Sequence, residues 1–255
     1  MESTIIDEVT FCGPTFYMKE YTSVTIFPMP AHTGIYINNI KLSPPNIKVI
    51  GNFVELGSVR LIEHLMSAFF ALGINNAYIY VNGNAIPILD GCSRIFIDKL
   101  KDNVFIYKHK KEKYFIDDQI KVVLTEDKND DLKHLESIRY ICIDKGEFEI
   151  IGDVDYPYAG KQYYSFKHMD EYYEKICDVK TFMNIEFFDY YTKHKELYGI
   201  KNENIFVFDE NTKFEGTELV RHKILDVLGD ILCLQFDIIG KISFSKTGHS
   251  INKKL

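Results

Sequence analysis

Apolar residues recur at helical spacing in two segments, one in each half of the chain. Between residues 219 and 232 they are spaced three or four positions apart and no proline interrupts them, which predicts a helix. Residues 59–72 show the same period along one face, and Gly73 is a suitable C-terminal cap. We therefore expect one long helix in each half.

Shorter apolar runs bounded by turn residues predict strands. One such run follows each long helix, at residues 77–81 and at residues 238–244. Further predicted strands cover residues 9–11, 23–27, 35–37, 119–124, 137–143, 147–152 and 205–208. Short helices are expected over residues 93–100 and 170–176, and a loop over 42–46, where two adjacent prolines disfavour a helix.

The order of elements repeats between the two halves. In each half a helix that begins near a histidine, His64 or His222, leads into an apolar strand. We interpret this as an internal duplication. It predicts an α+β fold of two similar α/β halves, each a sheet plus helices, stacked with the helices between the sheets. The predicted N-terminal half is residues 1–106 and the C-terminal half is residues 107–255.

Composition excludes several classes of function. The chain is 46% apolar and 26% charged, as in ordinary globular proteins, and its net charge of −7 argues against a nucleic-acid partner. No apolar run approaches the roughly 20 residues of a membrane span. The N-terminus does not resemble a secretory signal, so we expect a cytoplasmic protein. The five cysteines form no CxxC pair, which argues against a disulfide framework.

His222 and Asp226 are the first candidate metal ligands. They lie four residues apart on a predicted helix, so both side chains project from one face and can bind one ion. The same spacing is common in surface ion pairs and helix caps, and a third ligand is needed. His64 is the candidate, because it lies in an apolar helix directly after Glu63, and burying both groups is unfavourable unless a metal compensates. The alternative is a core histidine with Glu63 facing water.

These three ligands would leave a fourth coordination position open for water, as in catalytic zinc sites. Zinc lowers the pKa of such a water towards ~7, and Glu63 is placed to accept its proton. His249, on the polar loop after the last strand, can protonate a leaving amine. Lys223 can stabilise an oxyanion and Asp230 can orient His249. The set predicts metal-assisted amide hydrolysis, with zinc or, alternatively, iron(II) as the metal.

Four segments carry recognisable motifs: residues 62–65 (IEHL), 86–91 (IPILDG), 220–230 (VRHKILDVLGD) and 246–252 (KTGHSIN). In this order and spacing they resemble the UDP-3-O-acyl-N-acetylglucosamine deacetylases, and the resemblance extends from residue 9 to residue 255. It implies a zinc amidase that commits a sugar nucleotide to lipid A synthesis, with a two-layered, duplicated fold. By position, the resemblance implies the same zinc ligands, base and acid as the chemistry above.

The resemblance also implies roles for other residues. Lys223 matches the lysine near the oxyanion, and Asp230 matches the aspartate behind the acid histidine. Thr181 and Phe182 match an Arg-Thr-Phe segment, in which the threonine helps to stabilise the oxyanion and the phenylalanine lines the substrate pocket. Lys246 matches a lysine near the nucleotide phosphates.

Several positions depart from the family pattern. The arginine before Thr-Phe is Lys180 here, and the glycine after it is Met183. Residues 199–201 (GIK) replace Gly-Gly-Ser, and residues 17–19 (YMK) replace an early His-Thr/Ser-Gly. These positions bear on how substrate is held rather than on the metal chemistry. The acyl length and the exact substrate therefore stay open.

The sequence predicts zinc-dependent hydrolysis of the N-acetyl group of UDP-3-O-(3-hydroxyacyl)-N-acetylglucosamine, giving acetate and the free amine. The alternatives are a related zinc amidase with an altered substrate and a catalytically idle relative that binds sugar nucleotide. The idle alternative gives no physical reason for Glu63 and His249 to lie beside an unfavourable buried site. We expect a monomer whose acyl substrate brings it near the membrane.

Overall fold

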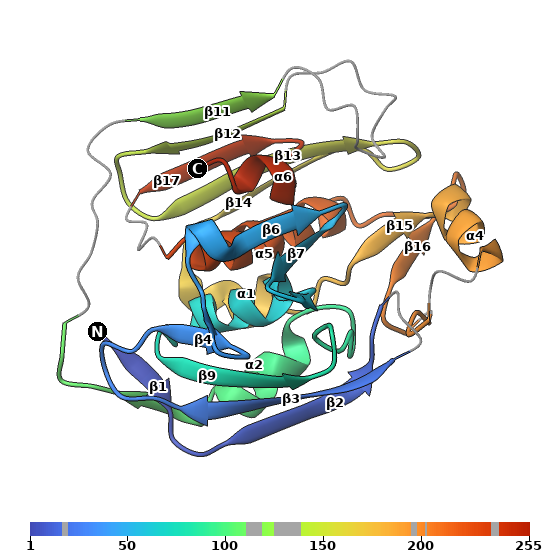
Figure 1. The fold of residues 1–255 in the computed structure, drawn as a ribbon. Helices are drawn as coiled ribbons and strands as arrows, with labels where there is room; N and C mark the ends of the chain where they lie inside the picture. The colour runs from blue at the N-terminus through green and yellow to red at the C-terminus, as the bar shows by residue number, and fades with distance from the viewer. Residues whose placement is uncertain (17–19, 111–118, 125–138, 195–197, 202, 236–239) are drawn as a thin grey trace.

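The computed structural model describes residues 1–16, 20–110, 119–124, 139–194, 198–201, 203–235 and 240–255. Two five-stranded sheets lie on opposite sides of a layer of helices (Figure 1). None of the helices in these ranges is long and apolar enough to cross a membrane.

The sheet of the N-terminal half has the strand order β2-β3-β9-β4-β5. Neighbouring strands are antiparallel except β4 and β9, which are parallel. Apolar residues at alternate positions of β3 face the core, whereas the residues between them are more exposed. The strands are β2 (Val9–Pro14), β3 (Tyr21–Pro28), β4 (Ile35–Ile37), β5 (Ile40–Lys41) and β9 (Ala77–Asn82).

The sheet of the C-terminal half has the order β11-β12-β17-β13-β14. Its only parallel neighbours among these strands are β13 and β17. In both halves, the strand of the sheet that comes last in the sequence lies at its centre. The other four strands run in the same directions relative to this central strand in both sheets. The predicted duplication and fold class are therefore confirmed. The strands are β11 (Ile120–Leu124), β12 (Arg139–Asp144), β13 (Glu149–Tyr156), β14 (Gly160–Phe166) and β17 (Lys241–Ser245).

Helices α1 (Glu63–Leu72) and α5 (Glu218–Cys233) precede the central strands of their sheets and pack against each other between the sheets. Gly229 permits a close approach, because a Cβ there would lie 2.2 Å from the carbonyl oxygen of Glu63. This contact brings the start of α1 onto the face of α5 that carries polar residues. α1 ends at Gly73 with a φ of 69°, as the sequence predicted.

Each half also carries an insert at a corresponding place in the sequence, after the first four strands of its sheet and before its long helix. The N-terminal insert is a three-stranded sheet, and the C-terminal insert is a helix between two parallel strands. The N-terminal insert consists of β6 (Ile47–Ile50), β7 (Phe53–Leu56) and β8 (Val59–Arg60). The C-terminal insert consists of β15 (Phe182–Asn184), α4 (Ile185–Lys193) and β16 (Phe206–Phe208).

Short elements complete the structure. β1 pairs with β10, and the predicted short helices form as α2 and as η2 followed by α3. The division of the chain at residue 106, where β10 ends, stays a prediction. The bounds are β1 (Ser3–Ile5), β10 (Val104–Ile106), α2 (Arg94–Leu100), η2 (Met169–Glu171), α3 (Tyr172–Lys175) and α6 (His249–Asn252).

The structure corrects some element bounds. The helix predicted over 59–72 begins at Glu63, because Leu61 has a φ of 59°, which a helix does not allow, and the preceding residues pair as β8. The loop predicted over 42–46 contains a 3₁₀ turn, η1 (Pro44–Asn46), since proline fits its first position. Residues 137–138 and 238–239 of two predicted strands lie outside the described residues.

Candidate active site

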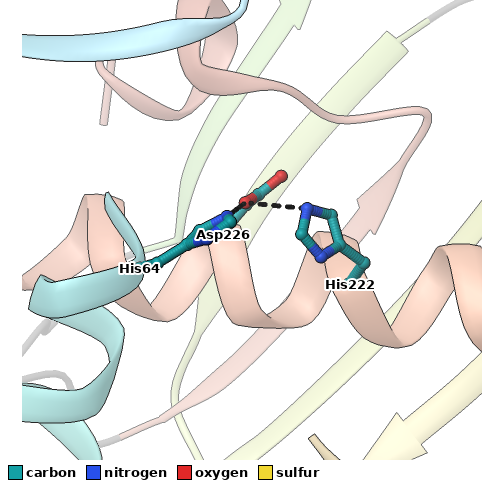
Figure 2. A group of neighbouring side chains, drawn as sticks. All are labelled: His64, His222 and Asp226. Carbon is teal, nitrogen blue, oxygen red and sulfur yellow. Dashed lines mark ion pairs between the residues drawn. The ribbon is translucent and has the colours of Figure 1, made fainter. Parts of the chain in front are cut away.

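His64, His222 and Asp226 converge where α1 meets α5 (Figure 2). α5 presents His222 and Asp226 one turn apart, and α1 contributes His64 from its first turn. Asp226 Oδ1 lies 3.7 Å from His64 Nε2 and 3.5 Å from His222 Nε2. All three potential donor atoms lie within 4.8 Å of one another. The structure thus brings together the three residues that the sequence proposed as ligands.

The donor set fits a divalent metal. The two separations from Asp226 are too long for hydrogen bonds, whereas a tetrahedral ion with bonds of about 2.0–2.2 Å spaces its ligands roughly 3.3–3.6 Å apart. His222 Nδ1 lies 3.0 Å from the carbonyl oxygen of Val179, so this nitrogen carries the proton and Nε2 presents a lone pair to Asp226. Two electron-rich atoms facing each other in a buried site repel unless a cation lies between them.

Electrostatics keep two of the ligand candidates, Asp226 and His222, in their metal-binding forms. Burial opposes the charge on Asp226, but two neighbours outweigh burial. Lys223, whose Nζ lies 2.9 Å from Asp226 Oδ2, has the larger effect, and His222 adds to it. The pKa of Asp226 therefore lies well below its ordinary value. Burial lowers the pKa of His222 to about 4. A carboxylate and a neutral imidazole are the forms that bind metal.

Glu63 is buried beside these ligands, and one of its oxygens is fixed. Its Oε2 accepts a hydrogen bond of 3.1 Å from the backbone N–H of Val54 in β7. Burial raises the pKa of Glu63, although nearby His249 and His64 oppose the shift. A carboxylate with a raised pKa suits a general base. The sequence did not reveal Val54, because a backbone donor leaves no side-chain signal.

His249 and Asp230 form a buried pair. His249 Nδ1 lies 2.8 and 2.9 Å from the two carboxylate oxygens of Asp230 on α5. Burial opposes the charged ring, but Asp230 outweighs it and raises the pKa of His249 to about 9. His249 is therefore an imidazolium at neutral pH, with Nδ1–H bonded to Asp230 and Nε2–H available to donate.

These groups share one cavity of about 250 Å³. Its polar wall contains the three metal-ligand candidates and the base and acid candidates, and its apolar wall draws on the C-terminal insert and the N-terminal half. The polar wall includes Glu63, His64, Thr181, His222, Lys223, Asp226, Thr247 and His249. The apolar wall includes Phe16, Leu61, Ile88, Phe182, Met183, Phe187 and Phe208.

Thr181 and Phe182 line this cavity as the sequence predicted. The backbone N–H of Thr181 donates to the carbonyl oxygen of Gly91 at 2.7 Å, which ties the C-terminal insert to the N-terminal half. The ring of Phe182 lies 5.5 Å from that of His222 and 5.4 Å from Lys223 Nζ. Both predicted residues therefore line the cavity of the metal-ligand candidates, and Phe182 contacts His222 directly.

Lys246, also a described residue, is not among those that line the cavity. Its Nζ lies 3.6 Å from Asp155 Oδ2, and the neighbouring Thr247 does line the cavity. The role of Lys246 near the nucleotide phosphates stays a prediction. In the altered segment 199–201, the backbone of Gly199 packs closely against Thr15. A Cβ added to Gly199 would lie 2.4 Å from the carbonyl oxygen of Thr15. The altered residues 17–19 lie outside the described residues.

Comparison with known proteins settles the family. The model of the UDP-3-O-acyl N-acetylglycosamine deacetylase family matches residues 2–255. The chain belongs to this family. It is 34% identical to the UDP-3-O-acyl-N-acetylglucosamine deacetylase of Nautilia profundicola, across 89% of this chain and 81% of that protein. It is 28% identical to the enzyme of the same name from Aquifex aeolicus, across 100% of this chain and 91% of that protein. The resemblance found in the sequence is confirmed.

Proposed function

We propose that this protein hydrolyses the N-acetyl group of UDP-3-O-(3-hydroxyacyl)-N-acetylglucosamine, an early step of lipid A biosynthesis, with zinc or iron(II) as its metal. The observation that carries the proposal is the gathering of three ligand candidates, a buried carboxylate and a charged histidine around one cavity. Family membership supports the choice of substrate. The cytoplasmic location and the monomeric state expected from the sequence stay predictions.

His64, His222 and Asp226 would hold the metal, which when bound supplies Lewis acidity and lowers the pKa of water at the site. The hydrogen bond from His222 Nδ1 to Val179 keeps Nε2 free for coordination. Lys223 keeps Asp226 ionised. The chain therefore holds His222 and Asp226 in the protonation states that coordination requires.

Glu63 accepts the proton of the attacking water. The backbone N–H of Val54 restrains one carboxylate oxygen, so the side chain is oriented before substrate arrives. As the water oxygen bonds to the acetyl carbon, negative charge develops on the carbonyl oxygen. Lys223 and Thr181, which line the same cavity, stabilise that charge.

His249 completes the reaction as the acid. Its Nε2–H protonates the sugar nitrogen as the carbon–nitrogen bond breaks, and acetate and the free amine leave. Asp230 stabilises the imidazolium and fixes the ring by accepting from Nδ1. Water is consumed, Glu63 gains one proton and His249 loses one. Once the products have left, Glu63 releases its proton and His249 takes one up, so both residues regain their starting protonation states for the next turnover.

An altered acyl substrate is the second candidate, and Met183 favours it. This side chain lines the cavity where the family pattern has a glycine, and its bulk would leave less room for a long acyl chain bound along the apolar wall. The catalytic groups are unaffected by this change. The reaction class would therefore stay the same while the preferred acyl length differs.

The test is acetate release by purified protein from substrates of graded acyl length. We expect release that a chelator abolishes and that added zinc or iron(II) restores. Release only from shorter acyl substrates would favour the altered substrate. Binding of UDP-sugar without release from any member of the series, in metal-loaded protein, would contradict the proposed hydrolysis and support an idle relative.

A further inference from the structure

A buried asparagine lies behind the acid pair. Asn252 is 0% exposed, and its Nδ2 donates to Asp230 Oδ2 at 2.7 Å. The same oxygen lies 2.8 Å from His249 Nδ1. One carboxylate oxygen thus accepts hydrogen bonds from both side chains. Asn252 is the last residue of the motif at residues 246–252, and the motif alone indicates no role for it.

Asp230 decides which way the Asn252 amide faces, and Thr247 holds the amide in that orientation. Its hydroxyl donates to Asn252 Oδ1, and it is 1% exposed and lines the cavity. A carboxylate can only accept, so Nδ2 must face Asp230 and Oδ1 must face Thr247. The opposite orientation would place two acceptors in contact. The four side chains therefore form one buried hydrogen-bonded chain: Thr247, Asn252, Asp230 and His249.

The one-turn helix α6 explains how two groups reach the same carboxylate. His249 is its first residue and Asn252 its last, and residues three positions apart share a helix face. The backbone N–H of Asn252 closes the turn by donating to the carbonyl oxygen of Gly248 at 3.0 Å. α6 packs against α5, which carries Asp230. Any rotation of α6 would move the acid and the asparagine together.

The side-chain bonds of Asn252 suit a role beyond stabilising the turn. The backbone bond to Gly248 already closes the turn and needs no particular side chain. Both polar atoms of the Asn252 amide are instead hydrogen-bonded to other buried side chains, Oδ1 to Thr247 and Nδ2 to Asp230. Because Asp230 accepts from two sides, its carboxylate cannot turn about χ2 without breaking a buried hydrogen bond.

We propose that Asn252, held in orientation by Thr247, is a positioning residue that fixes the carboxylate of Asp230 and thereby the ring of His249. The ring then keeps Nδ1 on Asp230 and Nε2 towards the cavity. This inference rests on the proposed function, because His249 serves as the acid only if the amide is hydrolysed. Asn252 is not among the residues that line the cavity, so replacing it should change kcat rather than KM.

The test compares Asn252→Leu, which keeps the size and removes the donor, with Thr247→Val and Thr247→Ser. We expect kcat of Asn252→Leu to fall about 10- to 100-fold, as is usual for residues that orient catalytic groups, with KM within about twofold of the parent. Thr247→Val should show a smaller fall that Thr247→Ser largely reverses. The exposed Lys254→Ala, in the following turn, is the matched control.

A second readout does not depend on activity. In protein labelled with ¹⁵N-histidine, the Nδ1–H resonance of His249, assigned by its loss in His249→Gln, should broaden or shift in Asn252→Leu and Thr247→Val. Folded variants with the parental kcat and an unchanged resonance would overturn the inference, as would a rise in KM alone. If Asn252→Leu does not fold, the same two measurements on the nearly isosteric Thr247→Val test the inference instead. Absence of acetate release by the parent would contradict the proposed function, while the resonance would still test the positioning.

Discussion

Replacing Asp230 with asparagine should move the alkaline limit of activity. Both oxygens of Asp230 lie within 2.9 Å of His249 Nδ1, and this carboxylate outweighs burial to raise the pKa of His249 to about 9. At about pH 7.5 roughly 97% of the rings are then protonated. Without the charge of Asp230, burial opposes protonation and only the smaller raising effects of Asp226 and Glu63 remain, so the pKa of His249 falls and fewer rings are protonated at this pH.

The sign of the effect follows from the role of His249. An acid works in its protonated form, so activity is present below the pKa of His249 and is lost as the pH rises through it. The alkaline limb of kcat/KM should therefore lie at about 9 in the parent and at a lower pH in Asp230→Asn. At about pH 7.5 the variant should lose rate, by roughly tenfold for each pH unit by which the limb falls below that pH.

The assay is acetate release from about pH 6 to about pH 10, with the metal content of each sample measured in parallel. Asp102→Asn, at an exposed position, is the matched control and should keep the parental profile. An alkaline limb that remains at about 9 in Asp230→Asn would refute the reasoning, because a group other than His249 would then control the limb.

Two further substitutions test the packing around the site. Met183→Ala should open the apolar wall and raise the ratio of kcat/KM for longer over shorter acyl substrates by about tenfold, the order expected for one or two methylenes; an unchanged ratio would exclude Met183 as the limit. Gly229→Ala places a Cβ where the Glu63 carbonyl oxygen lies 2.2 Å away, so it should push α1 from α5. We expect it to destabilise the protein by about 1–3 kcal/mol in urea unfolding and to weaken metal binding in a titration, and parental values of both would contradict the close approach.

The duplicated fold was predictable because each half repeats a helix followed by an apolar strand, and the helices show clear periodicity. The inserts were harder to predict. Strands β6 and β7 are four residues each, too short for a reliable pattern, and no residue of the half-exposed helix α4 is buried. The start of α1 was misplaced because nothing in the sequence indicates the positive φ of Leu61.

The candidate site was predictable where residue type alone indicates chemistry. His64, His222 and Asp226 are recognisable as candidate ligands, and the structure brings their potential donor atoms together. The groups that orient them were not predictable in the same way. The donor to Glu63 is a backbone N–H from another insert, and Asn252 acts on Asp230 only through tertiary contact.

The central claim is that Glu63 acts on water while His64, His222 and Asp226 bind the metal, and Glu63→Gln tests it most directly. Glutamine keeps an oxygen that can accept from Val54 and removes the basic carboxylate. Metal content per chain and acetate release should be measured on the same preparations. The account predicts parental metal content with release reduced by at least about 100-fold. Loss of the metal, or release near the parental rate, would contradict it.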